Sequence, residues 1–198
     1  IDLQYTSAGK PFIIIDNFLT DDDQATVLME LDQIIRPSMR REGTGEAVKD
    51  DVSVKKANAC FINDIYVNQF ISPTFRLLRN YFTQEFFKLI AESHWAYEWL
   101  LRVGFSENTQ FLYYDEQDSY DAHPDQADMS ALLWLAKEPR GFSGGDLIIE
   151  GEQTVEFKHN RIVIFSLGTM HQVTEVHKTL NLDGHGRYCI SNFFKGDL

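Results

Sequence analysis

Short apolar segments separated by turn residues fill the second half of this 198-residue chain, and they constrain its fold more than any other feature. β-Branched and aromatic residues are frequent in these segments, which is typical of strands. Glycine-containing turns such as Ser143-Gly144-Gly145 and Asp183-Gly184 separate several of them. We predict eight strands, near residues 97–104, 109–115, 129–136, 146–150, 153–157, 161–166, 171–176 and 187–194. This spacing predicts a double-sheet sandwich, that is, a jelly-roll (double-stranded β-helix) core.

The first half of the chain adds one strand and two helices. Residues 11–18 are rich in β-branched residues and predict a strand. Thr20 precedes three aspartates and predicts a helix start, because Thr caps well and acids suit the positive end of the helix dipole. Ser72-Pro73 predicts a second start. Its helix would carry an apolar stripe of Phe75, Leu78, Phe82, Phe86 and Leu89.

Residues 36–58 carry mixed charges and little that could build a core, so they predict a long loop or loose hairpin. We expect one domain over residues 1–198, mainly β with flanking helices. Its N-terminal part, residues 1–94, would hold the first strand, the helices and this loop. The jelly-roll core would span residues 95–198.

The formal net charge of −12 restricts the partners of this chain. It argues against a sequence-independent grip on nucleic acid and against docking on anionic lipid, since both need clustered cations. The two cysteines, Cys60 and Cys189, are too few for a disulfide scaffold and predict buried thiols. The chain shows no signal peptide and no apolar run long enough to cross a bilayer. We therefore expect a cytoplasmic protein.

One of the six histidines stands in a His-x-Asp pattern, His123-Pro124-Asp125. Residues i and i+2 of an extended segment point to the same side, so this imidazole and this carboxylate can bind one metal ion together. The pattern alone is weak, because it arises by chance in many proteins.

A third ligand is offered by His171, which follows the apolar strand at 161–165 after a short loop. Two His and one carboxylate on one face leave open positions on an octahedral metal, the arrangement of non-haem Fe(II) oxygenases. Zinc is the lesser alternative, because it favours tetrahedral sites. His177 is the rival third ligand, but it follows a strand where we expect an exposed turn.

Arg187 begins the last predicted strand. A guanidinium binds a carboxylate through two parallel hydrogen bonds. A keto acid that chelates the metal at one end would need such a partner at its other end.

With these residues in view, the chain from about Gln110 to Phe194 resembles the prolyl 4-hydroxylase branch of the Fe(II)/2-oxoglutarate dioxygenases. The segments that carry the resemblance occur in the order usual for that family. They are Phe111-Leu-Tyr-Tyr114, Tyr120, His123-Pro-Asp125, Ala131-Leu-Leu-Trp-Leu135, Phe142-Ser-Gly-Gly-Asp-Leu147, Ile162-Val-Ile-Phe165, His171 and Arg187-Tyr-Cys-Ile-Ser191. Residues 15–19, Ile-Asp-Asn-Phe-Leu, also match the way these domains begin.

The resemblance implies that His123, Asp125 and His171 ligate Fe(II) and that Arg187 binds the 5-carboxylate of 2-oxoglutarate. Many collagen-type relatives have Lys at this last position, whereas oxygen-sensing and bacterial relatives have Arg. The reaction implied is hydroxylation of a C–H bond by O2, with release of succinate and CO2 and with ascorbate as a reductant. Asp125 favours hydroxylation over halogenation, because halogenating relatives lack this carboxylate.

The resemblance also implies a wider pocket. A Tyr on the strand before His-x-Asp would donate to the same 2-oxoglutarate carboxylate, and either Tyr114 or Tyr113 fits. Tyr120 and Trp134 would line the pocket, and Ser191 would support the carboxylate.

The substrate implied is a prolyl residue in a peptide or protein, over which residues 39–57 would close as a lid. The alternatives are an oxygenase acting on a free amino acid or other small molecule, and a jelly-roll binding module without activity. Nucleic-acid demethylation conflicts with the acidic charge. The sequence leaves the oligomeric state open.

Overall fold

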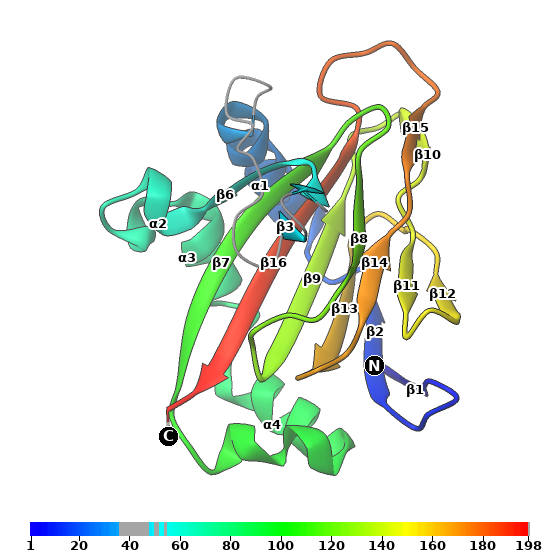
Figure 1. The fold of residues 1–198 in the computed structure, drawn as a ribbon. Coiled ribbons are helices and arrows are strands. Elements are labelled where there is room, and N and C mark those ends of the chain that lie inside the picture. The colour runs from blue at the N-terminus through cyan, green and yellow to red at the C-terminus, as the bar shows by residue number, and fades with distance from the viewer. Residues whose placement is uncertain (36–47, 50–51, 54, 198) are drawn as a thin grey trace.

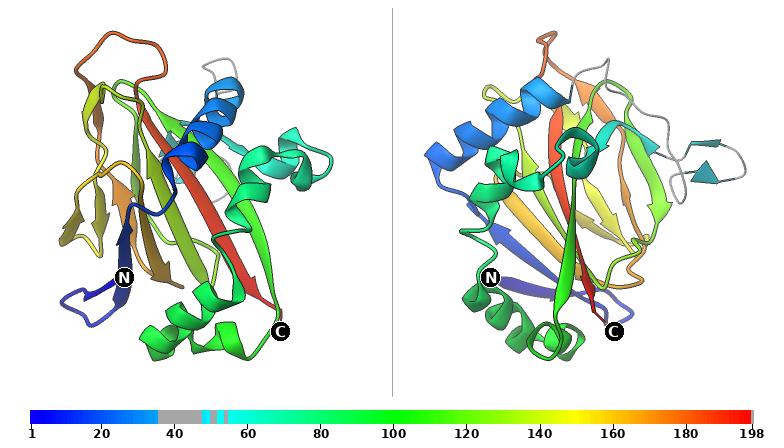
Figure 2. Two further views of the ribbon diagram at one scale, coloured as in Figure 1. Left: turned by 180° about the vertical axis from the view of Figure 1, so that it is seen from behind. Right: turned by 90° about the vertical axis from the view of Figure 1, so that its left-hand side faces the viewer.

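The computed structural model describes residues 1–35, 48–49, 52–53 and 55–197 of the chain. Two antiparallel sheets face each other, and helices cover the outer face of the larger sheet (Figures 1 and 2). This arrangement confirms the predicted jelly-roll core with flanking helices. The expected loop at residues 36–58 lies largely outside the described residues.

The larger sheet contains seven strands, and the last long strand, β16, lies near its middle between β9 and β7. In sheet order the strands are β1 (Asp2–Tyr5), β2 (Pro11–Asp16), β13 (Arg161–Ser166), β9 (Met129–Leu135), β16 (Arg187–Gly196), β7 (Phe105–Tyr114) and β6 (Asn58–Phe61).

The smaller sheet contains five shorter strands. In sheet order they are β12 (Gln153–Val155), β11 (Leu147–Ile149), β14 (His171–Val173), β8 (Ser119–His123) and β5 (Lys55–Lys56). Two further pairs lie outside both sheets: β10 (Phe142–Gly144) with β15 (Val176–Lys178), and β3 (Val48–Lys49) with β4 (Val52–Ser53).

The helical segments are α1 (Asp21–Ile34), α2 (Ile62–Ile65), α3 (Pro73–Leu78) and α4 (Gln84–Ser93), with the 3₁₀ helices η3 (Gln69–Ile71) and η4 (Trp95–Leu101). The two predicted caps are confirmed. The Thr20 side chain accepts a hydrogen bond from the backbone N–H of Asp23, and the Ser72 side chain accepts one from that of Phe75.

Two predicted elements were wrong. The single helix expected after Ser72 is divided into α3 and α4, because Thr83 caps a new helix by accepting from the N–H of Phe86. The strand expected at 97–104 is the 3₁₀ helix η4, which buries Tyr97 and Leu100 three residues apart. Its aromatic content had favoured a strand. Strands β1, β6, β8 and β10 were not predicted, and the segment 171–176 is divided between β14 and β15.

The larger sheet separates two hydrophobic cores. One lies between this sheet and the helices, and it includes Tyr188, Ile190 and Phe194 of β16. The other lies between the two sheets, and it includes Cys189 of the same strand and Trp134 of β9. Alternation along a strand sends successive side chains to opposite cores. Both cysteines are buried free thiols, as predicted.

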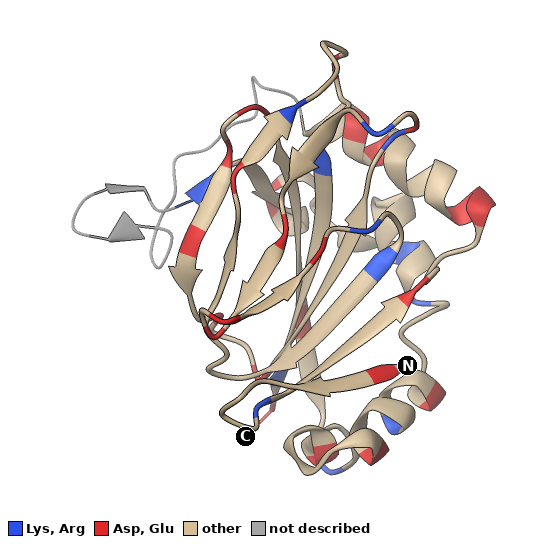
Figure 3. Cartoon of the chain, turned by 90° about the vertical axis from the view of Figure 1, so that its right-hand side faces the viewer, with Lys and Arg blue, Asp and Glu red and all other residues tan. Residues whose placement is uncertain are grey.

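Charged residues are distributed over the outside of the fold. In the view of Figure 3, acidic residues occur on the helices and at the ends of several strands, with basic residues placed singly among them. Among the residues that the structure describes, no helix combines the length and the apolar character needed to cross a membrane.

Candidate functional site

The structure brings His123, Asp125 and His171 together between the two sheets. One ligand atom from each residue lies within 4.8 Å of the others. Nε2 of His123 lies 3.7 Å from Oδ1 of Asp125, and Nε2 of His171 lies 3.6 Å from Oδ2. Both imidazoles are buried, with 5% and 4% of their surface exposed. These are the three residues singled out from the sequence, and within the described part of the chain they form the only such cluster.

A bulge in β8 aims the first histidine into the site. His123 pairs with His171, but Tyr120, three residues earlier, pairs with Val173, so β8 carries one extra residue. As a result Tyr120 and His123 point to the same side, and their rings stack with centres 3.5 Å apart. Tyr120 therefore lies against the triad, as expected of a pocket residue.

Backbone carbonyls orient both imidazoles. Nδ1 of His123 lies 2.8 Å from the carbonyl oxygen of Asp121, and Nδ1 of His171 lies 3.0 Å from that of Thr169. Because a carbonyl only accepts, each Nδ1 carries the proton and Nε2 keeps its lone pair. Burial, followed by the neighbouring His171, lowers the pKa of His123 to about 4, so its ring is neutral near pH 7. Neutral imidazoles are the form that binds metals.

Arg187 is a charged residue in the interior of the fold. Its side chain is fully buried, and its Nε donates to the carbonyl oxygen of Gly145 at 2.7 Å. Among the described residues, neither Nη1 nor Nη2 has a hydrogen-bond partner, and the same is true of Nε1 of Trp134. Cζ of Arg187 lies 5.0 Å from the ring centre of Tyr114 and 5.1 Å from that of Trp134. Buried donors without acceptors are costly, and these atoms could donate to the oxygens of an anion.

The surroundings of Gly145 explain why the Phe-Ser-Gly-Gly turn has glycine at its second Gly position. Its φ is +71°, and a Cβ at this position would lie 2.6 Å from Cδ of Arg187. Only glycine tolerates both the left-handed backbone and the close approach. The motif was noticed in the sequence, but its contact with Arg187 was not predicted.

The structure distinguishes the two tyrosines that the sequence left open. Tyr114 is buried in the core between the sheets and pairs with Arg187 across β7 and β16. Tyr113 points to the helix-facing core, where its hydroxyl accepts from the N–H of Gly186 at 3.0 Å and its ring packs on Tyr188. Tyr113 is therefore not part of this cluster, contrary to one of the two expectations.

Ser191 lies further along the same side of β16 as Arg187. It is buried, and its Oγ is 3.8 Å from Sγ of Cys189. The rival ligand His177 is in strand β15 rather than in the expected turn. Its side chain is 57% exposed and lies 3.5 Å from a carboxylate oxygen of Glu175. His177 is therefore remote from the buried cluster.

Two neighbours of the triad were not predicted to lie beside it, although Lys55 was expected in the lid at 39–57, where it could meet an acidic partner. Ser130 of β9 donates to Oδ2 of Asp125 at 2.6 Å. Lys55 of β5 pairs with Tyr120, so both side chains share one face of the sheet, and its Nζ lies 5.4 Å from the Tyr120 ring centre. Burial lowers the pKa of Lys55, and the Asp125 carboxylate opposes that shift. No sequence pattern distinguishes either residue from other serines and lysines.

The donor set fits a ferrous ion. Two imidazole nitrogens and one carboxylate oxygen leave further positions open on the ion, which suits Fe(II) better than structural zinc with its closed tetrahedral site. The unpartnered donors of Arg187 and Trp134 fit a carboxylate bound nearby. The residues present could thus hold both a metal ion and a dicarboxylic keto acid.

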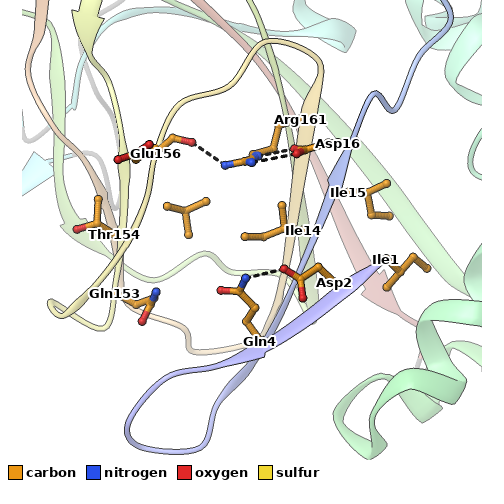
Figure 4. Close-up of a pocket in the computed structure, with 11 residues that line it drawn as sticks. Ile1, Asp2, Gln4, Ile14, Ile15, Asp16, Gln153, Thr154, Glu156 and Arg161 are labelled. Atoms are coloured by element: carbon orange, nitrogen blue, oxygen red, sulfur yellow. Dashed lines mark hydrogen bonds and ion pairs between the residues drawn. The ribbon is translucent and has the colours of Figure 1, made fainter.

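A separate groove of about 550 Å³ opens at the edge of the sandwich, lined by residues of β1, β2, β12 and β13 (Figure 4). Its guanidinium, Arg161, is engaged: Nε donates to Oδ1 of Asp16 at 2.6 Å, and Nη1 donates to the carbonyl oxygen of Glu156 at 2.9 Å. The groove contains none of the triad residues.

Comparisons with known proteins agree with this arrangement. Residues 109–195 match the sequence profile of the 2OG-Fe(II) oxygenase superfamily. The fold is similar to a prolyl-4-hydroxylase from Pseudomonas putida, with TM-score 0.60, 16% identity and coverage of 96% of this chain and 95% of that chain. It is also similar to a prolyl hydroxylase from Trichoplax adhaerens solved with a hypoxia inducible factor peptide, with TM-score 0.53, 13% identity and coverage of 93% and 83%.

A third similar structure is the alpha ketoglutarate dependent epimerase SnoN from nogalamycin biosynthesis, with TM-score 0.53, 13% identity and coverage of 93% of this chain and 77% of that chain. A search of curated protein sequences finds no match. These low identities establish a shared fold, and the profile match covers the strands that carry the triad and Arg187. Residues 109–195, the part of the chain that carries the triad and Arg187, are thus similar to the 2OG-Fe(II) oxygenase superfamily.

Proposed function

We propose that His123, Asp125 and His171 hold Fe(II) in this oxygenase and that Arg187 binds the distal carboxylate of 2-oxoglutarate. The observation that carries the proposal is the fully buried Arg187, which lies in the same interior as the triad. Its Nη1 and Nη2 have no partner among the residues that the structure describes. An uncompensated charge in a protein interior is retained where a ligand neutralises it.

The pocket offers three donors to one carboxylate. Arg187 supplies Nη1 and Nη2, and Trp134 supplies Nε1. Tyr114 adds a neutral phenol, because burial raises its pKa. Ser191 lies buried on the same side of β16 and would support the carboxylate. A bidentate guanidinium contact sets both the position and the direction of the bound acid.

When bound, iron supplies the oxygen chemistry that hydroxylates a C–H bond, with release of succinate and CO2. Ascorbate would serve as the external reductant. The chain positions the co-substrate through Arg187, fixes the tautomer and orientation of both imidazoles through their Nδ1–H bonds, and excludes water with the aromatic rings around them. Residues 1–198 would act as one domain, because the helix layer packs on the sheet that carries Arg187.

We propose a prolyl residue in a peptide or protein as the substrate. The similar structures from Pseudomonas putida and Trichoplax adhaerens support this choice, and the latter was solved with a peptide. Lys55, beside the triad, would favour an acidic peptide. The predicted lid at 39–57 lies largely outside the described residues. A nucleic-acid substrate conflicts with the net charge of −12.

The second candidate is the same chemistry on a free amino acid or other small molecule. It is favoured by the similarity to SnoN, an enzyme of nogalamycin biosynthesis. A jelly-roll module without activity would not need a buried guanidinium with two nitrogens unpartnered among the described residues, in the same interior as a complete triad.

The first test adds Fe(II) and 2-oxoglutarate to metal-free protein without oxygen. We expect a weak visible charge-transfer band that is absent in His171→Ala and weakened in Arg187→Leu. His177→Ala is the matched control, because His177 is exposed and should leave the band unchanged. If folded wild-type protein gives no band, the cofactor assignment is wrong.

The second test identifies the substrate. Proline-containing peptides and free amino acids are incubated with the aerobic complex, and a mass gain of one oxygen is sought. A gain on peptides alone supports the prolyl proposal, and a gain on free amino acids alone supports the second candidate.

A further inference from the structure

Ser130 connects the metal-binding carboxylate to the opposite sheet. It lies in β9 of the larger sheet, is 2% exposed, and donates to Oδ2 of Asp125 at 2.6 Å. His123 and His171 lie on the smaller sheet. The hydrogen bond therefore joins the triad to the part of the fold that also carries Arg187.

The two oxygens of Asp125 have different surroundings. Oδ2 accepts from Ser130 and lies 3.6 Å from Nε2 of His171, whereas Oδ1 lies 3.7 Å from Nε2 of His123. A carboxylate can give a metal one oxygen or both. A hydroxyl that donates to one oxygen sets the rotation of the group and occupies a lone pair of that oxygen.

The backbone of Ser130 is paired on both sides, so its position is fixed by the larger sheet. It pairs with Phe165 of β13 on one side and with Phe193 of β16 on the other, so it belongs to a central strand. Asp125, in contrast, follows the end of β8 in a connecting segment. A side chain on a loop gains precision when a residue on a rigid strand holds it.

We propose that Ser130 is a positioning residue of the metal centre, which holds Asp125 so that Oδ1 is the single oxygen given to the metal. This inference rests on the proposed function of the triad. One-oxygen donation would leave the remaining positions of the ion to the co-substrate and to O2.

The test is a calorimetric titration of metal-free protein with Mn(II), together with the anaerobic Fe(II)–2-oxoglutarate band. Ser130→Ala should raise the Kd for Mn(II) about 10- to 100-fold, the usual effect of losing a partner that orients a ligand. It should also shift the band. Ser130→Thr keeps the hydroxyl and should restore both values.

Ser72→Ala is the matched control. Ser72 is also fully buried and donates to a carboxylate, Oε2 of Glu30, at 3.0 Å, but in the helix layer. The Ser72→Ala variant should have a lower unfolding midpoint than wild-type protein and an unchanged Kd for Mn(II). Should Ser130→Ala fail to fold, Ser130→Cys replaces it, since a thiol is a weak donor of similar size.

An unchanged Kd in Ser130→Ala, or equal weakening in Ser130→Ala and Ser72→Ala, would overturn the positioning role. So would a stable Ser130→Thr variant that binds as weakly as Ser130→Ala. If wild-type protein binds no Mn(II), the metal centre itself is wrong, and this result is distinct from failure of the Ser130 proposal alone.

Discussion

Strand β16 has two buried faces whose polar groups differ. Tyr188, on the face toward the helices, donates its hydroxyl to Asp32 at 2.8 Å and lies 2.9 Å from the carbonyl oxygen of Gly184. Arg187, the residue before it, is just as buried, but its Nη1 and Nη2 have no partner in the described part of the chain. On the helix-facing side, the side-chain amide nitrogen of Asn192 also has no partner within the described ranges. An unpaired neutral amide costs far less than an unpaired charge.

Under the proposed function, the two faces of β16 have different roles: the helix-facing side stabilises the fold and the interior side binds the co-substrate. A fold selected for stability alone would satisfy or remove a buried guanidinium. Residues of the helix-facing side should therefore affect unfolding and leave ligand binding unchanged, whereas residues of the interior side should do the opposite. The following predictions challenge this division, beginning with the largest effect.

Phe194→Ala should give the largest loss of stability. Phe194 is fully buried in the helix-facing core, where its ring contacts Phe82, Phe87 and Phe105 at centre distances of 5.3–5.7 Å. Removal of a buried Phe costs about 3–5 kcal/mol. Denaturant unfolding would measure this loss. A large change in 2-oxoglutarate affinity in protein that remains folded would contradict the division.

Arg187→Leu should weaken 2-oxoglutarate binding about 100-fold or more, because a charge-assisted bidentate contact is lost. The free energy of unfolding should change little. Removal of an unpaired buried charge is favourable, and loss of the Nε bond to Gly145 offsets part of that gain. Anaerobic titration and thermal unfolding measure the two quantities.

Tyr188→Phe is the control for Arg187→Leu. It removes the hydrogen bond to Asp32 and should cost about 1 kcal/mol of stability, with normal co-substrate affinity. If Tyr188→Phe lowered the affinity for 2-oxoglutarate and Arg187→Leu lowered only the stability, the faces of β16 would not be divided as proposed.

Trp134→Phe should weaken 2-oxoglutarate binding about tenfold, the effect of one lost hydrogen bond to a charged acceptor. The ring remains large and apolar, so the core between the sheets should stay filled. Trp99→Phe is the matched control, because Trp99 packs on Phe105 in the helix layer. If wild-type and Trp134→Phe proteins bind 2-oxoglutarate with equal affinity, Nε1 of Trp134 does not contact the bound acid.

The smallest expected effect is a loss of unfolding free energy at acid pH. It should come from the paired guanidinium of Arg161 and not from Arg187. Arg161, by its hydrogen bond, lowers the pKa of Asp16 to about 2. The carboxylate therefore stabilises the fold above its unfolded pKa of about 4, and this stability is lost as the pH falls through about 2. Asp16 is 32% exposed, so we expect about 1 kcal/mol.

Unfolding measured from pH 5 to pH 2 should show this loss in wild-type protein and a flatter profile in Asp16→Asn. Arg187→Leu should keep the wild-type slope, because Arg187 is not part of the Asp16 pair. Identical profiles for wild-type protein and Asp16→Asn would mean that the pair contributes nothing.

The sequence alone determined the residue types of the site. His-x-Asp, a later histidine and a strand that begins with Arg were recognised because metal and carboxylate chemistry need those groups in that order. It also determined most strands of the jelly roll, since apolar segments and glycine turns are local signals. The break between α3 and α4 was missed because the cap signal at Thr83 was weaker than the apolar stripe that runs across it, and η4 was missed because its aromatic residues favoured a strand.

Only the tertiary structure decided which neighbours complete the site. Tyr114 and Tyr113 are equivalent in sequence, and the register of β7 against β16 places Tyr114 beside Arg187. The extra residue in β8 aligns Tyr120 with His123, and the packing of β9 brings Ser130 to Asp125. Local periodicity tells which side chains share a face, but register, bulges and the approach of two sheets depend on contacts between distant segments.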